Sequence, residues 1–260
     1  MLLRNREACR IGRPHVGAHA ASEQECIVNR YLRRGARWLA VGSGVAAAAY
    51  GVYVGITWYR YGGTAPPNAD EEDPLLDRFM PAYEIAERHH IRVAAAAAVT
   101  LDVAREVDLL ASPVARTIIR AREVILGATP DERPRPRGLL AEVQSLGWGV
   151  LAEVPGREVV VGAVTKPWEA NVTFRALPPD QFAAFDEPGY VKIAWSIRAD
   201  PLNATESVFR TETRAIATDT SARSRFRRYW SFLSPGIIVI RWAVLGPVKN
   251  EAERRARQER

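Results

Sequence analysis

The side chains best suited to acid–base chemistry are Glu87 and His89, which lie two positions apart in the segment YEIAERHHIRV, residues 83–93. Apolar and polar residues alternate in this segment, which is the two-residue period of a half-buried strand. Glu87 and His89 share the parity of Ile85 and Ile91, so they are predicted to point toward the interior. A buried carboxylate beside an imidazole is costly unless it is paired or hydrated. Two interpretations follow: a ligand-facing role, or a paired position at the rim of the interior.

Other constellations that support catalysis or metal binding are not found in the sequence. There is no Ser/His/Asp or Cys/His array and no glycine-rich phosphate loop, so no cofactor is predicted. His90 faces away from His89 on the same strand, so the two cannot chelate one metal ion from one face. The two cysteines, Cys9 and Cys26, lie near the N-terminus. No metal site is predicted.

The composition is that of a folded protein with a modest positive charge. The 260 residues are 47% hydrophobic and 25% charged, and the formal net charge is +6. The excess comes from scattered arginines, because the chain has only three lysines, Lys166, Lys192 and Lys249. No basic stripe with interleaved aromatic residues is present, so nucleic-acid binding is not predicted.

Residues 38–58, WLAVGSGVAAAAYGVYVGITW, contain no charged side chain. About twenty helical residues match a hydrocarbon core roughly 30 Å thick. Trp38 at one end and Trp58, followed by Tyr59 and Tyr61, at the other place aromatic rings at both interfaces. We expect a retained single-pass transmembrane helix. The alternatives are a buried helix of a soluble protein and a cleaved signal peptide, whose small-residue cleavage site is not seen here.

The orientation of this span is predicted from the flanking arginines. The residues that precede it closely are Arg30, Arg33, Arg34 and Arg37, whereas Arg60 and Arg78 follow it among several acidic residues. The N-terminus is therefore expected in the cytoplasm, with the folded part extracytoplasmic and attached to the cell membrane. Both cysteines would then lie on the reducing side.

Breaks in composition divide the chain into five predicted parts. Glycine, proline and acidic residues mark a linker, and arginine-rich segments mark the two ends. The predicted parts are a basic mobile tail at 1–37, the span at 38–58, the linker at 59–79, the folded domain at 80–250 and a charged tail at 251–260.

Within the predicted domain, the hydrophobic period changes in an ordered way. It indicates one strand, two helices, a short third helix, several antiparallel strands and a C-terminal helix. Ser112-Pro113 supplies an N-cap and a first-turn proline for the second helix. The predicted strands are 83–93, 147–154, 158–165, 170–176, 189–199 and 206–217, and the predicted helices are 99–110, 113–127, 138–145 and the segment that begins after Asp219.

Side-chain parity predicts a sheet with one wet face. In strand 189–199, Trp195 points inward with its apolar neighbours, whereas Arg198 points outward. In the C-terminal segment, Ser234-Pro235-Gly236 is expected to interrupt the helix. Residues 229–248 are a rival second span, but Arg241 would cost roughly 2.5–3.5 kcal/mol near a bilayer centre, so a packed helix is favoured.

Four segments carry a resemblance to a known superfamily: HIRVAAAAAVT (90–100), GYVKIAWSIRADP (189–201), FRTETRAIATD (209–219) and RFRRYWSFLSPG (225–236). With the element order, they resemble the START-like helix-grip superfamily, in particular the bacterial polyketide cyclase/dehydrase and lipid-transport group, often called SRPBCC. Members often have a proline and an acidic residue where this chain has Ala96 and Ala98. The resemblance implies an α+β fold in which a curved antiparallel sheet grips a long C-terminal helix around an apolar cavity.

The residues themselves agree with such a cavity. Large rings at inward parity face small partners such as Ala152 and Ala215, which leaves room unless these side chains simply fill an ordinary core. The residues predicted to line the cavity are Trp148, Phe174, Trp195, Phe209, Thr211, His89 and Glu87.

Three functions remain open at this stage. The first is a membrane-anchored, non-catalytic domain that binds a hydrophobic small molecule or lipid. The second is a polyketide cyclase/aromatase-like enzyme that uses Glu87 and His89 as an acid/base pair in the cavity. The third is a structural or interaction role in which the protein's own side chains fill the interior.

Overall fold

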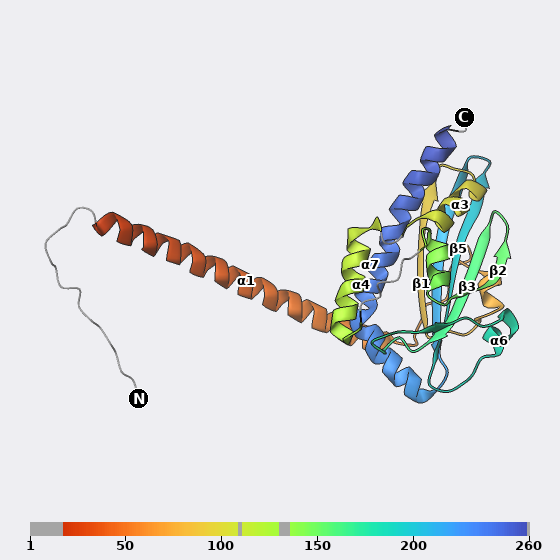
Figure 1. Cartoon of the computed structure of the whole chain (residues 1–260), viewed down its shortest axis with the longest axis horizontal. Helices are drawn as coiled ribbons and strands as arrows, with labels where there is room; N and C mark the ends of the chain where they lie inside the picture. Colours follow the sequence, from red (N-terminus) through yellow and green to blue (C-terminus); the bar gives the residue numbers. More distant parts are fainter. Residues whose placement is uncertain (1–17, 109–110, 130–135, 259–260) are drawn as a thin grey trace. The chain divides into compact units, whose positions relative to one another are not determined.

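The computed structural model describes residues 18–108, 111–129 and 136–258 (Figure 1). The chain divides into two compact units, residues 1–53 and residues 54–260. The first unit contributes most of one long helix, and the second contains a sheet and the remaining helices.

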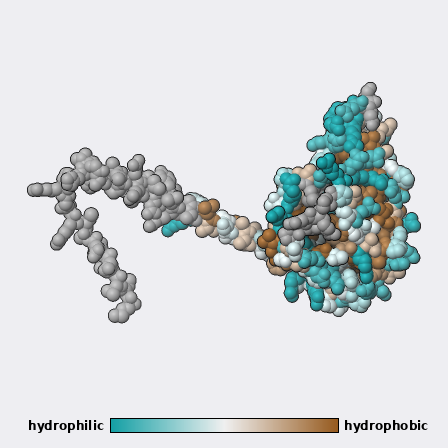
Figure 2. All heavy atoms as spheres, viewed as in Figure 1, coloured by the Kyte–Doolittle hydropathy of each residue, from teal (hydrophilic) through white to brown (hydrophobic). Residues whose placement is uncertain are grey.

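Helix α1 spans Ala18–Arg60, so residues 18–37 are helical where a mobile tail was expected. Alanine, glutamate, glutamine and arginine are frequent there, and all four favour helix. The part of α1 from Arg37 to Arg60 is long and apolar enough to cross a membrane, and its most apolar window is 0% buried within the protein. Figure 2 shows apolar colours along most of this stretch. Residues 1–17, with Cys9, lie outside the described part of the chain.

The second unit is built on a six-stranded antiparallel sheet in the order β1-β6-β5-β3-β2, with the short β4 paired to β3. Predicted strands 158–165 and 206–217 are confirmed to the residue, whereas 170–176 shrinks to two residues. The strands are β1 (Ile85–Val93), β2 (Gly149–Val154), β3 (Glu158–Thr165), β4 (Phe174–Arg175), β5 (Val191–Asn203) and β6 (Glu206–Ala217).

Six helices surround the sheet in the described part of this unit. Ser112 caps α4 with Pro113 in its first turn, as predicted, and Gly127 ends it with a φ of 69°. Helix α6 was not predicted. The bounds are α2 (Pro74–Asp77), α3 (Ala97–Glu106), α4 (Pro113–Leu126), α5 (Leu139–Ser145), α6 (Pro179–Ala184) and α7 (Thr220–Gln258).

Helix α7 is continuous through Pro235 and Pro247 and extends to Gln258, beyond the expected end of the domain at residue 250. The predicted interruption at Ser234-Pro235-Gly236 is therefore a bend, visible in the first half of α7 in Figure 1. A proline inside a helix removes one hydrogen bond and kinks the axis, but packing on both sides can keep the helix intact. Although α7 is also long and apolar enough to cross a membrane, residues along it such as Phe226, Leu245 and Val248 are buried in the domain core.

The inner face of the sheet carries the main core, beneath α3 and α7. Phe209 of β6 and Leu101 of α3 are fully buried there, together with Val248 and Ala252 of α7. A second cluster at the start of α7 joins Phe226 and Trp230 to the sheet. The α+β arrangement of a curved antiparallel sheet along a long C-terminal helix is thus confirmed, as a helix-grip fold.

The outer face of the sheet is covered, not wet as predicted. Leu76 of α2 and Phe182 of α6 are both 0% exposed on this face, so β3 is buried on both sides. Arg198 of β5, predicted to point outward, is only 6% exposed, and Arg214 of β6 is only 1% exposed. The sequence pattern missed this layer because the segment that forms it has the glycine, proline and acidic composition of a linker.

The segment predicted as a linker, residues 59–79, is therefore part of the folded unit. At its start, the Tyr61 hydroxyl donates to Glu84 at 2.7 Å. Arg227 of α7 donates to the carbonyl oxygen of Trp58 at 2.6 and 2.9 Å. At its end, Asp73 caps α2 and accepts from the Ser196 hydroxyl of β5 at 2.8 Å. These contacts join both ends of the segment to the domain.

Candidate functional site

An apolar cavity of about 230 Å³ lies between the inner face of the sheet, α5 and α7. It is larger than the roughly 150 Å³ cavity that accommodates benzene, and smaller than the usual 300–1,000 Å³ of drug-sized pockets. The residues that line it are Leu139, Val143, Leu146, Trp148, Phe174, Trp195, Phe209, Thr211, Ile237, Ile240, Arg241 and Val244. The cavity therefore suits a small guest, or the end of a longer one.

The sheet supplies the aromatic wall of this cavity. The Trp195 indole of β5 donates to the Thr211 hydroxyl of the neighbouring β6 at 2.5 Å, which fixes the orientation of both side chains. The rings of Trp148 and Phe174 pack at 5.2 Å between centroids, tilted by 34°, beside the turn at Gly147, where φ is 102°. Only glycine adopts this conformation without strain, so the turn that brings the two rings together depends on it.

Helix α7 supplies the opposite wall. Ile237, Ile240, Arg241 and Val244 follow the i, i+3, i+4, i+7 spacing of one helical face, and all four line the cavity. Just before this stripe, Gly236 allows close packing, since a Cβ there would lie 2.7 Å from Ile118 of α4. The bend and the close approach together place this face of α7 over the sheet.

Arg241 is the only titratable side chain among the described residues that line the cavity. Its guanidinium lies 5.3 Å from the ring centroid of Trp195. Its Nε atom is buried without a hydrogen-bond partner in the described structure. Burial lowers the pKa of Arg241 to about 10, and the negative charge of Glu87 opposes this shift. The side chain is therefore still a cation at neutral pH, and it is half-buried beside mostly apolar groups, with its Nε atom fully buried.

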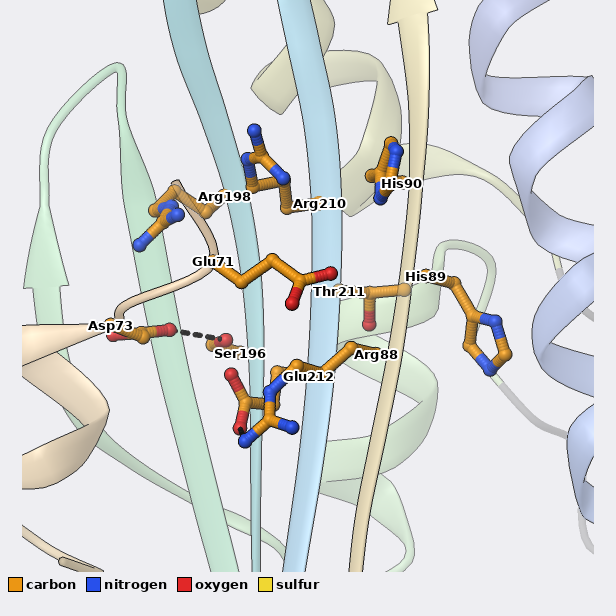
Figure 3. Close-up of a pocket in the computed structure, with 10 residues that line it drawn as sticks. All are labelled: Glu71, Asp73, Arg88, His89, His90, Ser196, Arg198, Arg210, Thr211 and Glu212. Carbon is orange, nitrogen blue, oxygen red and sulfur yellow. Dashed lines mark hydrogen bonds and ion pairs between the residues drawn. The ribbon is translucent and has the colours of Figure 1, made fainter. Parts of the chain in front are cut away.

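Glu87 and His89 lie beside the cavity but do not line it. The His89 Nε2 atom is 3.8 Å from the Glu87 carboxylate, and the imidazole packs edge-on against Trp242 of α7 at 5.3 Å. Figure 3 shows the His89 side chain turned toward α7, away from Arg88 and Glu212. The structure thus places the pair in the rim position, one of the two interpretations of the sequence.

Burial shifts the pKa values of Glu87 and His89 in opposite directions. Burial raises the pKa of Glu87, while Arg241 and Arg88 lower it. Burial lowers the pKa of His89, and the positive charge of Arg241 lowers it further. His89 is therefore neutral at pH 7. The Glu87 carboxylate then interacts electrostatically mainly with the positive charges of Arg241 and Arg88.

The polar pocket in Figure 3 lies largely on the outer face and has a structural role. Its volume of about 20 Å³ suffices for about one water molecule. Asp73 accepts from the Ser196 hydroxyl at 2.8 Å, and Arg198 donates to the carbonyl oxygen of Glu72 at 2.7 Å. These contacts attach the segment before α2 to the sheet.

Of the seven residues predicted to line a cavity, the structure brings five together around it: Trp148, Phe174, Trp195, Phe209 and Thr211. Their role in binding a ligand stays a prediction. The sequence reasoning missed Arg241 as a lining residue and weighed it only as a cost to a membrane span. The available signal was its position on the same helical face as Ile237 and Val244. Among the described residues, no cluster of three potential metal ligands occurs.

The sheet, the long C-terminal helix and the apolar cavity between them define a helix-grip domain. No protein-family model and no curated protein matches the chain. Some solved structures resemble it, among them the following three. A hypothetical protein of Helicobacter pylori, jhp0584, is 7% identical with a TM-score of 0.35, over 73% of this chain and 99% of that one.

Two more of these structures are of aromatase/cyclases. The Zhui aromatase/cyclase of Streptomyces sp. R1128 is 16% identical with a TM-score of 0.21, over 66% of this chain and 94% of that one. The di-domain aromatase/cyclase BexL of the BE-7585A biosynthetic pathway is also 16% identical, with a TM-score of 0.22, over 65% of this chain and 46% of BexL. These likenesses are too distant to assign an activity to this chain.

Proposed function

We propose that this protein is a membrane-anchored, START-like helix-grip domain that binds a small hydrophobic molecule, or the end of a lipid chain, without catalysis. The observation that supports it is the 230 Å³ cavity walled by aromatic and aliphatic side chains. Each 100 Å² of apolar guest surface buried there contributes about 2.5 kcal/mol before the costs of association.

A cyclase-like reaction is the second candidate, supported only by the proximity of Glu87 and His89 to the cavity. An acid or base must reach the reacting group directly or through one water molecule. Among the described lining residues, the one titratable group is Arg241, which stays protonated at neutral pH and cannot act as a base. This arrangement favours binding over catalysis.

The test of binding compares two neighbouring residues of α7. Ile240 lines the cavity, whereas Val239 is 44% exposed. The full-length wild type, Ile240→Trp and Val239→Trp are purified from the host and analysed by native mass spectrometry and solvent extraction. We expect an apolar guest on the wild type and on Val239→Trp, and none on Ile240→Trp, whose indole fills the cavity. A guest that persists on Ile240→Trp, or a wild type that carries none, contradicts the proposal.

Anchoring through residues 38–58, with the N-terminus in the cytoplasm, is part of the same proposal. The apolar stretch Arg37–Arg60 and the arginines before it support this orientation. An epitope tag at the C-terminus should be digested by protease added to intact spheroplasts, while an N-terminal tag should be protected. The reverse pattern, or release of the protein by alkaline washing, contradicts the proposed topology.

A further inference from the structure

We propose that Arg241 binds the acidic group of the guest, so that the cavity selects a small apolar carboxylic acid over a neutral molecule of the same shape. This inference rests on the proposed binding function and names its ligand class. It starts from the position of one cation in an otherwise apolar lining.

Arg241 has no carboxylate partner among the described residues, although part of its guanidinium is buried. No described carboxylate lies within 4 Å of it, its Nε atom is buried without a hydrogen-bond partner, and its guanidinium carbon lies 5.3 Å from the ring centroid of Trp195. A buried charge is costly unless it is paired and hydrogen-bonded. The five N–H donors of arginine form a planar fork that matches the two oxygens of a carboxylate. A guest carboxylate would supply the missing acceptors.

The charged groups around Arg241 leave room for such an anion. Glu87 faces it from β1 and attracts it electrostatically, but the two do not form an ion pair. His89 on the same strand is neutral at pH 7, because burial and the charge of Arg241 lower its pKa. The negative charge of Glu87 therefore compensates the positive charge of Arg241 only in part, and a guest carboxylate can still pair with Arg241.

The remaining walls suit the apolar body of such an acid. The cavity exposes the rings of Trp148, Phe174 and Phe209, together with leucine, isoleucine and valine side chains. Scaled from a benzene-sized cavity of about 150 Å³, its volume admits an apolar body of roughly six to ten non-hydrogen atoms. The Thr211 hydroxyl accepts from Trp195 and retains a donor for a guest oxygen.

The test uses the full-length chain in nanodiscs of uncharged phosphatidylcholine and isothermal titration with octanoate, 1-octanol and octylammonium. Empty nanodiscs correct for partition into the bilayer. Wild type is compared with Arg241→Met, which keeps the length of the side chain and removes its charge. Arg228→Met, at an exposed position of α7, is the matched control. Thermal unfolding of each variant verifies folding.

We expect octanoate to bind the wild type and Arg228→Met at least about tenfold more tightly than 1-octanol, as a charge-assisted hydrogen bond allows. Arg241→Met should lose this preference while it still binds 1-octanol, and its unfolding temperature without ligand should not fall, since a half-buried cation with no ion-pair partner among the described residues has been removed. Equal binding of octanoate and 1-octanol by the wild type, or an acid preference that survives in Arg241→Met, overturns the inference but leaves the proposed function intact. Failure of every probe to bind the wild type overturns both.

Discussion

Replacement of Arg214 by methionine is expected to loosen the cover on the outer face of the sheet. Arg214 lies on β6 and its side chain is 1% exposed. It donates to Glu212 at 2.7 Å and to the carbonyl oxygen of Met80 at 2.9 Å, and it pairs with Asp77 at the end of α2. Arg214→Met keeps most of the volume and removes all of these interactions.

The loss of stability in Arg214→Met depends on which interactions Glu212, Asp77 and Met80 keep without the guanidinium. Glu212 keeps Arg88 at 3.1 Å, and the Asp77 side chain is half exposed and can be hydrated. Loss of the charge-assisted hydrogen bond to Glu212 costs about 1.5–3 kcal/mol, and the unsatisfied carbonyl of Met80 about 1–3 kcal/mol. We therefore expect a loss of about 3–5 kcal/mol, in the range found for broken buried ion pairs. For a domain of this size, that corresponds to a Tm lower by roughly 6–20 °C.

Urea unfolding of the full-length chain in a mild detergent, followed by circular dichroism, measures this loss. Arg228→Met, an exposed arginine of α7, is the control and should change the free energy of unfolding by less than about 0.5 kcal/mol. If Arg214→Met costs less than about 1 kcal/mol, the network on the outer face does not hold the segment before β1, and the reasoning fails.

Two further changes test the packing of the sheet. Burial and the neighbouring Asp73 carboxyl raise the pKa of Glu158 to about 8, against about 4.3 in an unfolded chain. The native state then holds a proton that the unfolded state lacks, so stability falls as pH rises from about 5 to 8. Glu158→Gln should flatten this decline by up to about 1.4 kcal/mol per pH unit in urea titrations, and an unchanged slope would argue against a protonated Glu158. Gly162→Ala places a Cβ 3.0 Å from the Phe182 ring and should cost about 1–3 kcal/mol, whereas Gly246→Ala, which meets nothing within 4 Å, should cost nothing.

The sequence predicted those elements whose signal is local. Strand 206–217 was found to the residue, because the charged Arg210, Glu212 and Arg214 alternate with uncharged residues at its centre. Ser112-Pro113 located the start of α4 by the chemistry of its cap. The alternation of side chains along single strands also predicted that Trp195, Phe209 and Thr211 share one face of the sheet. All three line the cavity on that face.

Features that depend on contacts distant in the sequence were not predictable in the same way. Asp73 caps α2 and also accepts from Ser196, 123 positions further along the chain. Nothing in the local composition of residues 70–80 indicates that they cover β5 and β6. Likewise, the single charge of Arg241 in an apolar run was interpreted as a cost to a membrane span, because only the fold shows that it faces an internal cavity.

The two faces of the sheet have opposite effects on stability. Protein cores are normally close-packed, so the side chains that wall the cavity lack some of the packing contacts that stabilise a filled core. The Arg241 cation, whose Nε atom is buried without a hydrogen-bond partner, adds to this cost. The outer face compensates, because α2, α6 and the Arg214 network hold the central strands without any contribution from the cavity walls. Filling the cavity should therefore stabilise the fold and abolish binding at once, a conflict expected where a cavity is kept open for a guest rather than left by imperfect packing.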